Sequence, residues 1–140
     1  MNRPYTAQQF EALVNKLYAK LPRAFVVYRH HLRFSRRNGR GFQETLDVAQ
    51  RCRFSKIHVF PYSQREGTPA AARTDQVPPE MRAERARTLR ALAKQLRQQD
   101  RENRAGTSEL ALIEENGVAM TESYHELPAP EAAKQARSCP

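Results

Sequence analysis

Apolar residues recur at helical spacing in three stretches of the chain, and shorter apolar runs typical of β-strands lie between and after them. Thr6 and Gln9 form a T-x-x-Q capping box ahead of the first helical stretch, and Pro22 ends it. Asn116 and Gly117 separate two apolar runs, which is a strong short-range signal for a hairpin. The pattern predicts helices over 6–21, 42–52 and 80–101, a strand over 57–60, and hairpin strands over 110–114 and 118–124.

The order of these elements indicates an α/β fold followed by a small β module. Helix 42–52 presents Phe42, Leu46 and Ala49 on one face, and helix 80–101 presents a narrow seam of Leu89, Leu92 and Leu96. After Leu127 the chain reads PAPEAAKQARSCP, which has low β-propensity and no alternation. We therefore expect residues 128–140 to form a flexible tail.

The composition restricts the class of protein. At 140 residues, with a mean hydropathy of -0.81, the chain is one small domain or parts of two, with a modest core. No apolar run approaches a membrane span, and the N-terminus has no signal-like segment, so a soluble, cytoplasmic protein is expected. Cys52 and Cys139 are far apart and lack metal-ligand spacing, which favours two ordinary thiols.

Candidate ligand-binding chemistry follows the strand at 57–60. Pro61 ends that strand, and the loop behind it carries polar and aromatic side chains together with Gly67, which permits unusual backbone geometry. Ligands of α/β proteins bind at such junctions, although a plain surface turn is an equally open interpretation. The side chains suited to a polar ligand are Tyr62, Ser63, Arg65 and Thr68.

Two long strings carry a resemblance to a known family. HVFPYSQREGTPAA followed by QVPPEMRAERARTLRAL closely resembles the end of the catalytic barrel in radical-SAM tRNA methylthiotransferases of the MiaB/MtaB type. MNRPYTAQQFEALVNKL looks like an earlier barrel helix, and SELALIEENGVAMTESYHEL is similar to the beginning of the family's TRAM module, with TESY favouring the threonylcarbamoyladenosine branch. The resemblance implies the end of a partial radical-SAM barrel over 1–77, a linking helix over 78–104, a truncated TRAM-like β module over 105–127, and the tail.

The resemblance also implies a function. Enzymes of this family add a methylthio group to a hypermodified adenosine next to the anticodon of tRNA, using S-adenosylmethionine and two 4Fe-4S clusters. Their closely spaced cluster cysteines are missing here, so we expect this chain to bind none of these cofactors and to be inactive alone. The implied partner is the tRNA anticodon stem-loop, with no membrane and no DNA. In family terms the loop residues lie near S-adenosylmethionine and the target base, with Arg65 as the foremost polar contact.

The TRAM-like module suggests RNA contacts of its own. A TRAM module is a small β-barrel that binds RNA, so the resemblance implies RNA contacts by three residues. The alternative is that they are ordinary strand residues. They are Thr121, Tyr124 and His125.

The segment YRHHLRFSRRNGRGF, residues 28–42, gives the chain much of its formal charge of +9. Arginines with interleaved aromatic rings suit single-stranded RNA. At this place the family carries a strand and loop resembling TDIIVGFPGETEEDF, of the same length, and codons permitted for the segment, read from their second base, can encode TDII, one other residue and GFPGETEED. We therefore hypothesise a compensated frameshift over 28–42, without which the charge would be about -1.

Three functional interpretations remain open: a C-terminal fragment of a methylthiotransferase, a non-catalytic basic RNA-binding adaptor, and a nonfunctional gene remnant. The sequence also yields a structural expectation. Because an inward strand carrying Arg29 and Arg33 would bury charge, we expect Tyr28 to Gly41 to be irregular or solvent-facing. The strand at Ile57 would then keep an exposed edge.

Overall fold

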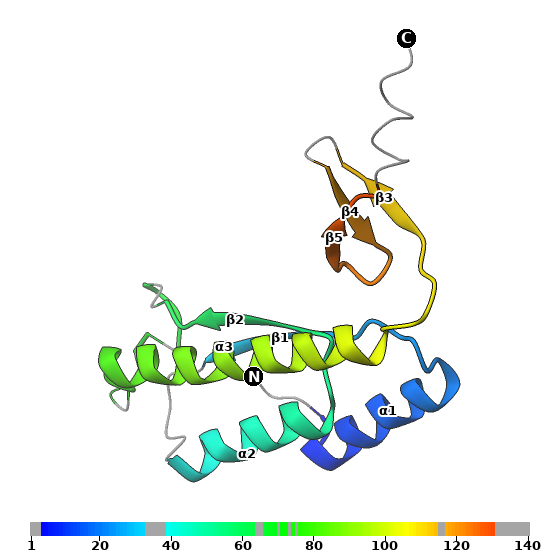
Figure 1. Ribbon diagram of the computed structural model, residues 1–140. Helices are drawn as coiled ribbons and strands as arrows, with labels where there is room; N and C mark the ends of the chain where they lie inside the picture. Colours follow the sequence, from blue (N-terminus) through cyan, green and yellow to red (C-terminus); the bar gives the residue numbers. More distant parts are fainter. Residues whose placement is uncertain are drawn as a thin grey trace. The chain divides into compact units, whose positions relative to one another are not determined.

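The computed structural model describes residues 4–32, 39–63, 66–69, 71–72, 74, 76–114 and 117–130. The chain divides into two compact units, Met1–Asp100 (unit 1) and Arg101–Pro140 (unit 2), each of which is treated by itself. Together they make a mixed α/β protein, as the sequence predicts (Figure 1). Among the described residues, no helix combines the length and the apolar composition of a bilayer-crossing segment.

Unit 1 is built on two parallel strands with helices before, between and after them (Figure 1). Tyr28 lies opposite Ile57 in the register, and α2 is the crossover between the strands. Its last helix, α3, continues a few residues past the boundary between the units. The elements are α1 (Ala7–Lys20), β1 (Val27–Leu32), α2 (Gly39–Arg51), β2 (Lys56–Pro61) and α3 (Pro79–Asn103).

The predicted capping box starts α1. The Thr6 side chain accepts a hydrogen bond from the Gln9 backbone N–H at 3.2 Å, and the Gln9 side chain accepts one from the Thr6 N–H at 2.8 Å. These bonds satisfy donors that a helix start leaves without helical partners. Phe10 and Val14 of this helix face the core.

Aromatic packing forms the centre of unit 1. The rings of Tyr28 and Phe54 stack with centroids 4.8 Å apart and planes at 9°, and the Phe10 ring lies 6.1 Å from that of Phe54. The surrounding apolar cluster draws one or more residues from every helix of the unit. The predicted inward faces of α2 and α3 are confirmed, because Phe42 and Leu46 pack against the buried Leu89.

Ser55 is a buried polar link among three elements. Its hydroxyl donates to Asp100 Oδ1 at 3.2 Å and accepts from the Val26 N–H at 3.3 Å, while its own N–H donates to the Val26 carbonyl at 3.0 Å. These bonds attach the starts of both strands to the last turns of α3. A buried hydroxyl satisfied in this way stabilises the fold, whereas one without partners would destabilise it.

The expectation for Tyr28 to Gly41 was an irregular or solvent-facing segment. The described part is regular, so the first of these alternatives is wrong there. Val27–Leu32 forms β1, which pairs with β2 along its whole length, and α2 begins at Gly39 rather than at Phe42. The expectation assumed that a strand here would turn Arg29 inward, but the strand alternates with Tyr28 toward the core and Arg29 toward solvent. No arginine is buried there, so the predicted cost does not arise. Residues 33–38 lie outside the described residues.

Unit 2 contains a three-stranded antiparallel sheet in the order β3-β4-β5. Its strands are β3 (Ala111–Ile113), β4 (Val118–Thr121) and β5 (Glu126–Pro128). The predicted hairpin of β3 and β4 is confirmed, and Gly117 takes the positive φ of 76° that its turn requires. Asn116 lies outside the described residues.

The third strand was not predicted. The expected strand 118–124 ends at Thr121, where the chain turns back and pairs β5 with β4. The Ala129 N–H donates to the Gly117 carbonyl at 2.9 Å, so the sheet extends past Leu127 into the start of the predicted tail. Residues 131–140 of that tail lie outside the described residues.

Candidate functional site

The loop behind β2 is held at its start by a residue of α3 and farther along by a hydrogen-bonded turn of its own. Arg82 of α3 donates from Nη1 to the Tyr62 carbonyl at 3.2 Å, which fixes the first loop residue. Farther along, Thr68 Oγ1 accepts from the Ala71 N–H at 3.2 Å, and the Thr68 carbonyl accepts from the same N–H at 2.9 Å. Gly67 precedes this turn with a φ of 75°. The loop is therefore a shaped turn at the carboxyl end of a strand in a parallel pair.

The four predicted site residues of this loop differ in what they offer a ligand. Tyr62 is half-buried, Ser63 is exposed, and Thr68 is half-buried with its hydroxyl engaged in the turn. Arg65 lies outside the described residues. Of the described positions, Ser63 has the side chain most accessible to a polar ligand.

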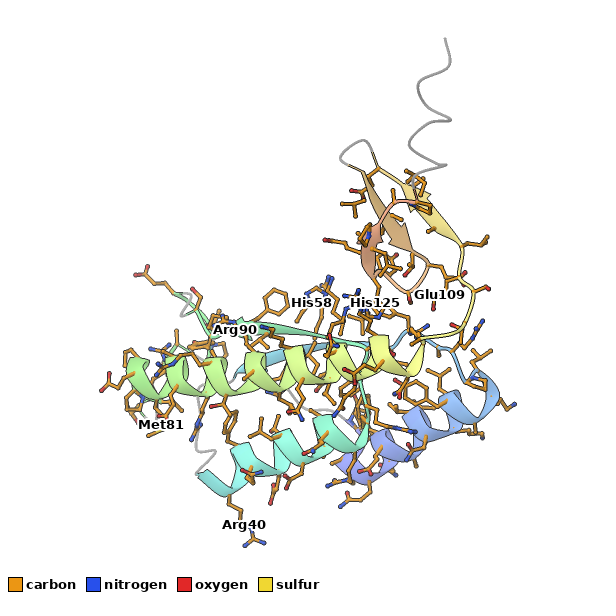
Figure 2. All side chains as sticks on the ribbon, in the orientation of Figure 1. Arg40, His58, Met81, Arg90, Glu109 and His125 are labelled. Carbon is orange, nitrogen blue, oxygen red and sulfur yellow. The ribbon has the colours of Figure 1, made fainter. Side chains whose placement is uncertain are left out.

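Sequence reasoning missed one face of the sheet in unit 1, which no described helix of the unit covers and which is here called the uncovered face. The helices pack on the face that carries Tyr28, Ile57 and Val59. On the opposite face Phe60 is exposed, with the Arg29 guanidinium carbon 6.0 Å from its ring centroid and the His58 ring 6.3 Å away. Figure 2 shows His58 on the side of the sheet away from α2. Strict alternation of Lys56, His58 and Phe60 was the signal that could have revealed this face.

Unit 2 contains a chain of polar side chains that closes its last turn. Arg104 donates from Nη1 to Glu109 Oε1 at 2.8 Å, and Ser123 donates from Oγ to Glu109 Oε2 at 2.5 Å. The Thr121 and Ser123 hydroxyl oxygens are 3.0 Å apart, and Thr121 Oγ1 accepts from the His125 N–H at 3.1 Å. The network thus ties the turn 121–125 to the segment that enters the sheet.

The charge at the centre of this network is well stabilised. The side chains of Arg104 and Glu109 are only 13% and 11% exposed. Burial alone would raise the pKa of Glu109, but hydrogen bonds from Ser123, Arg104 and Thr121 outweigh it and lower the pKa from 4.5 to about 2. Glu109 is therefore ionised at neutral pH and holds the turn as a carboxylate.

The three residues predicted to contact RNA differ in exposure because of their places in this turn. Thr121 and His125 are buried, and Thr121 makes the internal hydrogen bonds just described. Tyr124 is 61% exposed and has a φ of 58°. A non-glycine residue in this conformation is uncommon, and here hydrogen bonds on both sides maintain it. Only Tyr124 of the three presents a broad surface to a ligand.

The thiol chemistry of the described residues does not fit an iron–sulfur cluster. Cys52 is fully buried, and burial raises the pKa of its thiol, which disfavours the thiolate that ligates iron. Within the described ranges, no group of three or more His, Cys, Asp or Glu side chains could hold a metal ion. Cys139 lies outside those ranges.

Two parallel strands with a crossover helix make unit 1 an α/β unit, and the comparisons with known proteins identify its relatives. The chain is 32% identical over 127 residues to a tRNA-2-methylthio-N(6)-dimethylallyladenosine synthase of Corynebacterium urealyticum, covering 91% of this chain and 24% of that protein. A threonylcarbamoyladenosine tRNA methylthiotransferase MtaB of Aquifex aeolicus is 32% identical over 124 residues, covering 89% of this chain and 30% of the relative. The MtaB of Bacillus subtilis is 41% identical over 96 residues, 69% of this chain and 21% of the relative.

The chain is thus homologous, over most of its length, to a segment of the MiaB/MtaB-type tRNA methylthiotransferases, which confirms the resemblance. It spans about a quarter of the length of the curated relatives that it matches. No family model matches it.

Proposed function

We propose that this chain is the C-terminal part of a tRNA methylthiotransferase. The observation that carries the proposal is the homology, which extends over 91% of the chain and therefore includes residues of both units. In this assignment residues 1–77 form the end of a partial radical-SAM barrel, 78–104 the linking helix and 105–127 a truncated TRAM-like module. The β-helix-β order of unit 1 is what a barrel wall requires.

In this function the loop behind β2 lies at the mouth of the barrel, near S-adenosylmethionine and the target adenosine. Ser63 and Arg65 contact the ligand, while Tyr62 and Thr68 shape the loop through the contacts that their backbone and hydroxyl groups make. The two 4Fe-4S clusters and S-adenosylmethionine depend on the rest of such an enzyme. We expect this chain alone to be inactive, because the closely spaced cluster cysteines of the family are missing from its sequence.

Unit 2 helps to bind the anticodon stem-loop of tRNA. The protein acts in the cytoplasm. Tyr124 stacks on an unpaired base, because its ring is exposed and the turn beneath it is fixed by the Glu109 network. Thr121 and His125 act through the shape of that turn rather than by direct contact.

A chimaera tests the proposed function. The chain would replace the matched 127 residues of the Corynebacterium urealyticum synthase, in one version unchanged and in a second with residues 28–42 taken from that relative. We expect the second version to produce methylthiolated adenosine in tRNA, measured by nucleoside mass spectrometry, and the first to produce much less. A second version that folds and holds its clusters without any product would contradict the proposal.

The active chimaera also tests the loop. We expect Arg65→Ala to lower kcat/KM by about 10- to 150-fold, since a charged hydrogen bond to a ligand contributes about 1.5–3 kcal/mol. Glu66→Ala is the matched control, because Glu66 is an exposed neighbour. Equal effects of the two substitutions would show that Arg65 does not contact the ligand.

The frameshift over 28–42 remains our proposal for the origin of the basic segment. Reading the nucleotide sequence tests it directly. Codons that cannot encode GFPGET in the shifted frame would end it, and an upstream frame encoding CxxxCxxC would identify an interrupted gene.

One observation favours a second candidate function, a non-catalytic RNA-binding adaptor. The uncovered face of unit 1 combines the exposed ring of Phe60 with Arg29 and Lys56, which suits base stacking with phosphate contacts. The adaptor requires that the chain alone bind a single-stranded RNA oligomer with an affinity that falls steeply with salt. If Phe60→Ala and Arg29→Ser leave that affinity unchanged, this candidate is wrong.

A further inference from the structure

Two leucines of the sheet in unit 2 are exposed on one of its faces. Leu112 of β3 is 71% exposed, and Leu110 is 79% exposed. The pairing with β4 includes Leu110, because its carbonyl accepts a hydrogen bond from the Glu122 N–H at 2.9 Å. Residues two apart in a strand lie on the same face, and on that face Leu112 lies opposite the half-buried Met120. The other face carries the buried Ala119, so the leucines lie on the face opposite the buried one.

The strand that carries these leucines is also an edge of its sheet. Among the described residues β3 pairs with β4 and with no other strand (Figure 1). The Glu114 N–H donates to the Val118 carbonyl at 2.8 Å, so the hydrogen-bonded pairs of β3 and β4 fall at positions 110, 112 and 114. Because these bonds alternate along an antiparallel strand, the N–H and carbonyl of Ala111 point away from β4. Ala111 can therefore exchange two hydrogen bonds with a further strand.

The two edges of the sheet differ in their protection. At the β5 edge, the bond from the Ala129 N–H to the Gly117 carbonyl directs the backbone of Pro128 away from β4, where proline has no N–H to donate. Proline and charge are devices by which proteins prevent an edge strand from pairing with another chain. The segment 110–113 contains neither. The β3 edge is therefore open to another strand, whereas the β5 edge is blocked.

A second copy of the same strand fits the β3 edge. A two-fold axis at Ala111 makes the pairing antiparallel, with Ala111 opposite its own copy and Leu110 opposite Leu112 of the other chain. No like charges then lie opposite each other along 110–112. A register centred on Leu112 would instead place Leu110 opposite Glu114. The sequence of β3 is thus self-complementary about Ala111, as an isologous interface requires.

We propose that β3 is a dimerisation edge, at which two copies of this chain pair antiparallel about Ala111. The two three-stranded sheets then join into one sheet with the strand order β5-β4-β3-β3-β4-β5. Leu110 and Leu112 of both copies form one apolar stripe across the junction, which removes part of their exposed surface from water. Pro128 lies at both outer edges of the joined sheet, so assembly stops at two copies. The inference is independent of the proposed function, because it uses only residues of unit 2.

The oligomeric state of the full 140-residue chain tests the proposal. Sedimentation equilibrium would be measured over a series of concentrations in about 1 M salt, where a Debye length of about 3 Å screens the repulsion between two basic chains. We expect a reversible equilibrium between monomer and dimer with a dissociation constant below about 1 mM.

Two lysine substitutions form a matched pair. Leu112→Lys should weaken the dimer by about tenfold or more, because it places a charge in the apolar stripe of each copy. Leu13→Lys introduces the same charge at a leucine of α1 that is similarly exposed, 65% against 71%, and should leave the dimer unchanged. Ala111→Pro should also weaken the dimer by about tenfold or more, while the circular dichroism of the monomer is retained, because the lost N–H points away from β4.

A cysteine substitution tests the register. Directly opposed residues of a hydrogen-bonded antiparallel pair have Cα atoms about 5.5 Å apart, within the range of a disulfide. Ala111→Cys, in a chain that also carries Cys139→Ser, should therefore form a covalent dimer on mild oxidation with diamide, whereas Glu126→Cys in the same background should not. The proposal is overturned if the chain stays monomeric up to about 1 mM. It is also overturned if Leu13→Lys dissociates the dimer as strongly as Leu112→Lys, or if Ala111→Cys forms no cross-link.

Discussion

Unit 1 is organised around stacked aromatic rings, whereas unit 2 is organised around a buried carboxylate. In unit 1 the rings of Phe10, Tyr28 and Phe54 meet below a parallel strand pair. Among the described residues of unit 2 the buried apolar side chains are Ala119 and Ala129, and Glu109 accepts short hydrogen bonds from Arg104 and Ser123. Apolar burial does not titrate, whereas a hydrogen-bonded carboxylate loses its charge in acid. The two units should therefore respond differently to the same change of conditions.

Their charges differ as well. Residues 1–100 have 20 Lys and Arg against 8 acids, and residues 101–140 have 4 against 7. The basic character of the chain thus belongs to unit 1 alone. Under the proposed function, unit 1 supplies the electrostatic attraction of RNA and unit 2 supplies stacking by the exposed Tyr124.

The largest expected effect comes from the aromatic core. Phe54→Ala should destabilise unit 1 by about 3–5 kcal/mol, because it removes a fully buried ring and leaves a cavity against Tyr28. Denaturant unfolding followed by amide hydrogen exchange would measure it. Phe60→Ala is the control, since its ring is exposed and should cost less than about 1 kcal/mol. Equal losses would show that the stacked rings are not the centre of the fold.

Acid should act on unit 2 first. The pKa of Glu109 is about 2 in the folded chain and 4.5 as the ordinary value, so its stabilisation is complete above pH 4.5 and is lost as the pH falls toward 2. The full loss amounts to about 3 kcal/mol. Amide exchange in β4 and β5 should accelerate over this interval before that in β1 and β2.

Glu109→Gln separates this effect from general acid unfolding. The variant should lose stability in unit 2 already at pH 7 and should lack the pH dependence of the parent between 4.5 and 2. Glu122→Gln is the control, because Glu122 is exposed. An unchanged pH profile in the Glu109 variant would refute the role of the carboxylate.

The polar link in unit 1 should contribute less than its rings. Ser55→Ala leaves Asp100 and the Val26 N–H without the Ser55 hydroxyl, at a cost of about 1–2 kcal/mol to unit 1. Ser63→Ala, at an exposed position, should change stability by less than about 0.5 kcal/mol. Thermal unfolding of both variants measures the difference.

The smallest effect concerns the turn that presents Tyr124. Tyr124→Gly relieves a positive φ and should change the stability of unit 2 by no more than about 1 kcal/mol, in the stabilising direction. The same substitution should remove stacking on RNA. A strongly destabilised variant would show that the ring supports the sheet instead of facing a ligand.

Local signals predicted most of the helices and the hairpin. The capping box of Thr6 and Gln9, the leucine seam of α3 and the Asn116-Gly117 turn signal each depend on residues that are close in sequence. β5 was missed because its strand forms only when the Glu109 network turns the chain at Thr121. That network joins residues 104, 109 and 123, whose side chains give no local pattern.

Some features of the candidate site were likewise predicted from the sequence, and others were not. Residues of the loop after β2 were predicted from composition and resemblance, and the structure describes Tyr62, Ser63 and Thr68 at the end of that strand. The uncovered face with Arg29 and Phe60 was not predicted, because it depends on which strand lies beside β2. Thr121 and His125 are buried because of their places in the turn, which their residue types alone do not indicate.

The sequence by itself determined the helices and the hairpin, because helix caps and turn residues act over short distances. It also determined the relation to the methylthiotransferases, because that relation rests on continuous strings of similar residues. Only the tertiary structure decided that Val27–Leu32 is a strand. Its arginine-rich composition argues against an inward strand, but pairing with β2 puts Tyr28 on Phe54 and leaves Arg29 in solvent. A strand has two faces, and the face that becomes the core is fixed by the partner strand and the helices packed on it. The side chains of Val27–Leu32 point alternately to the two faces of the strand, and only those neighbours decide which set is buried.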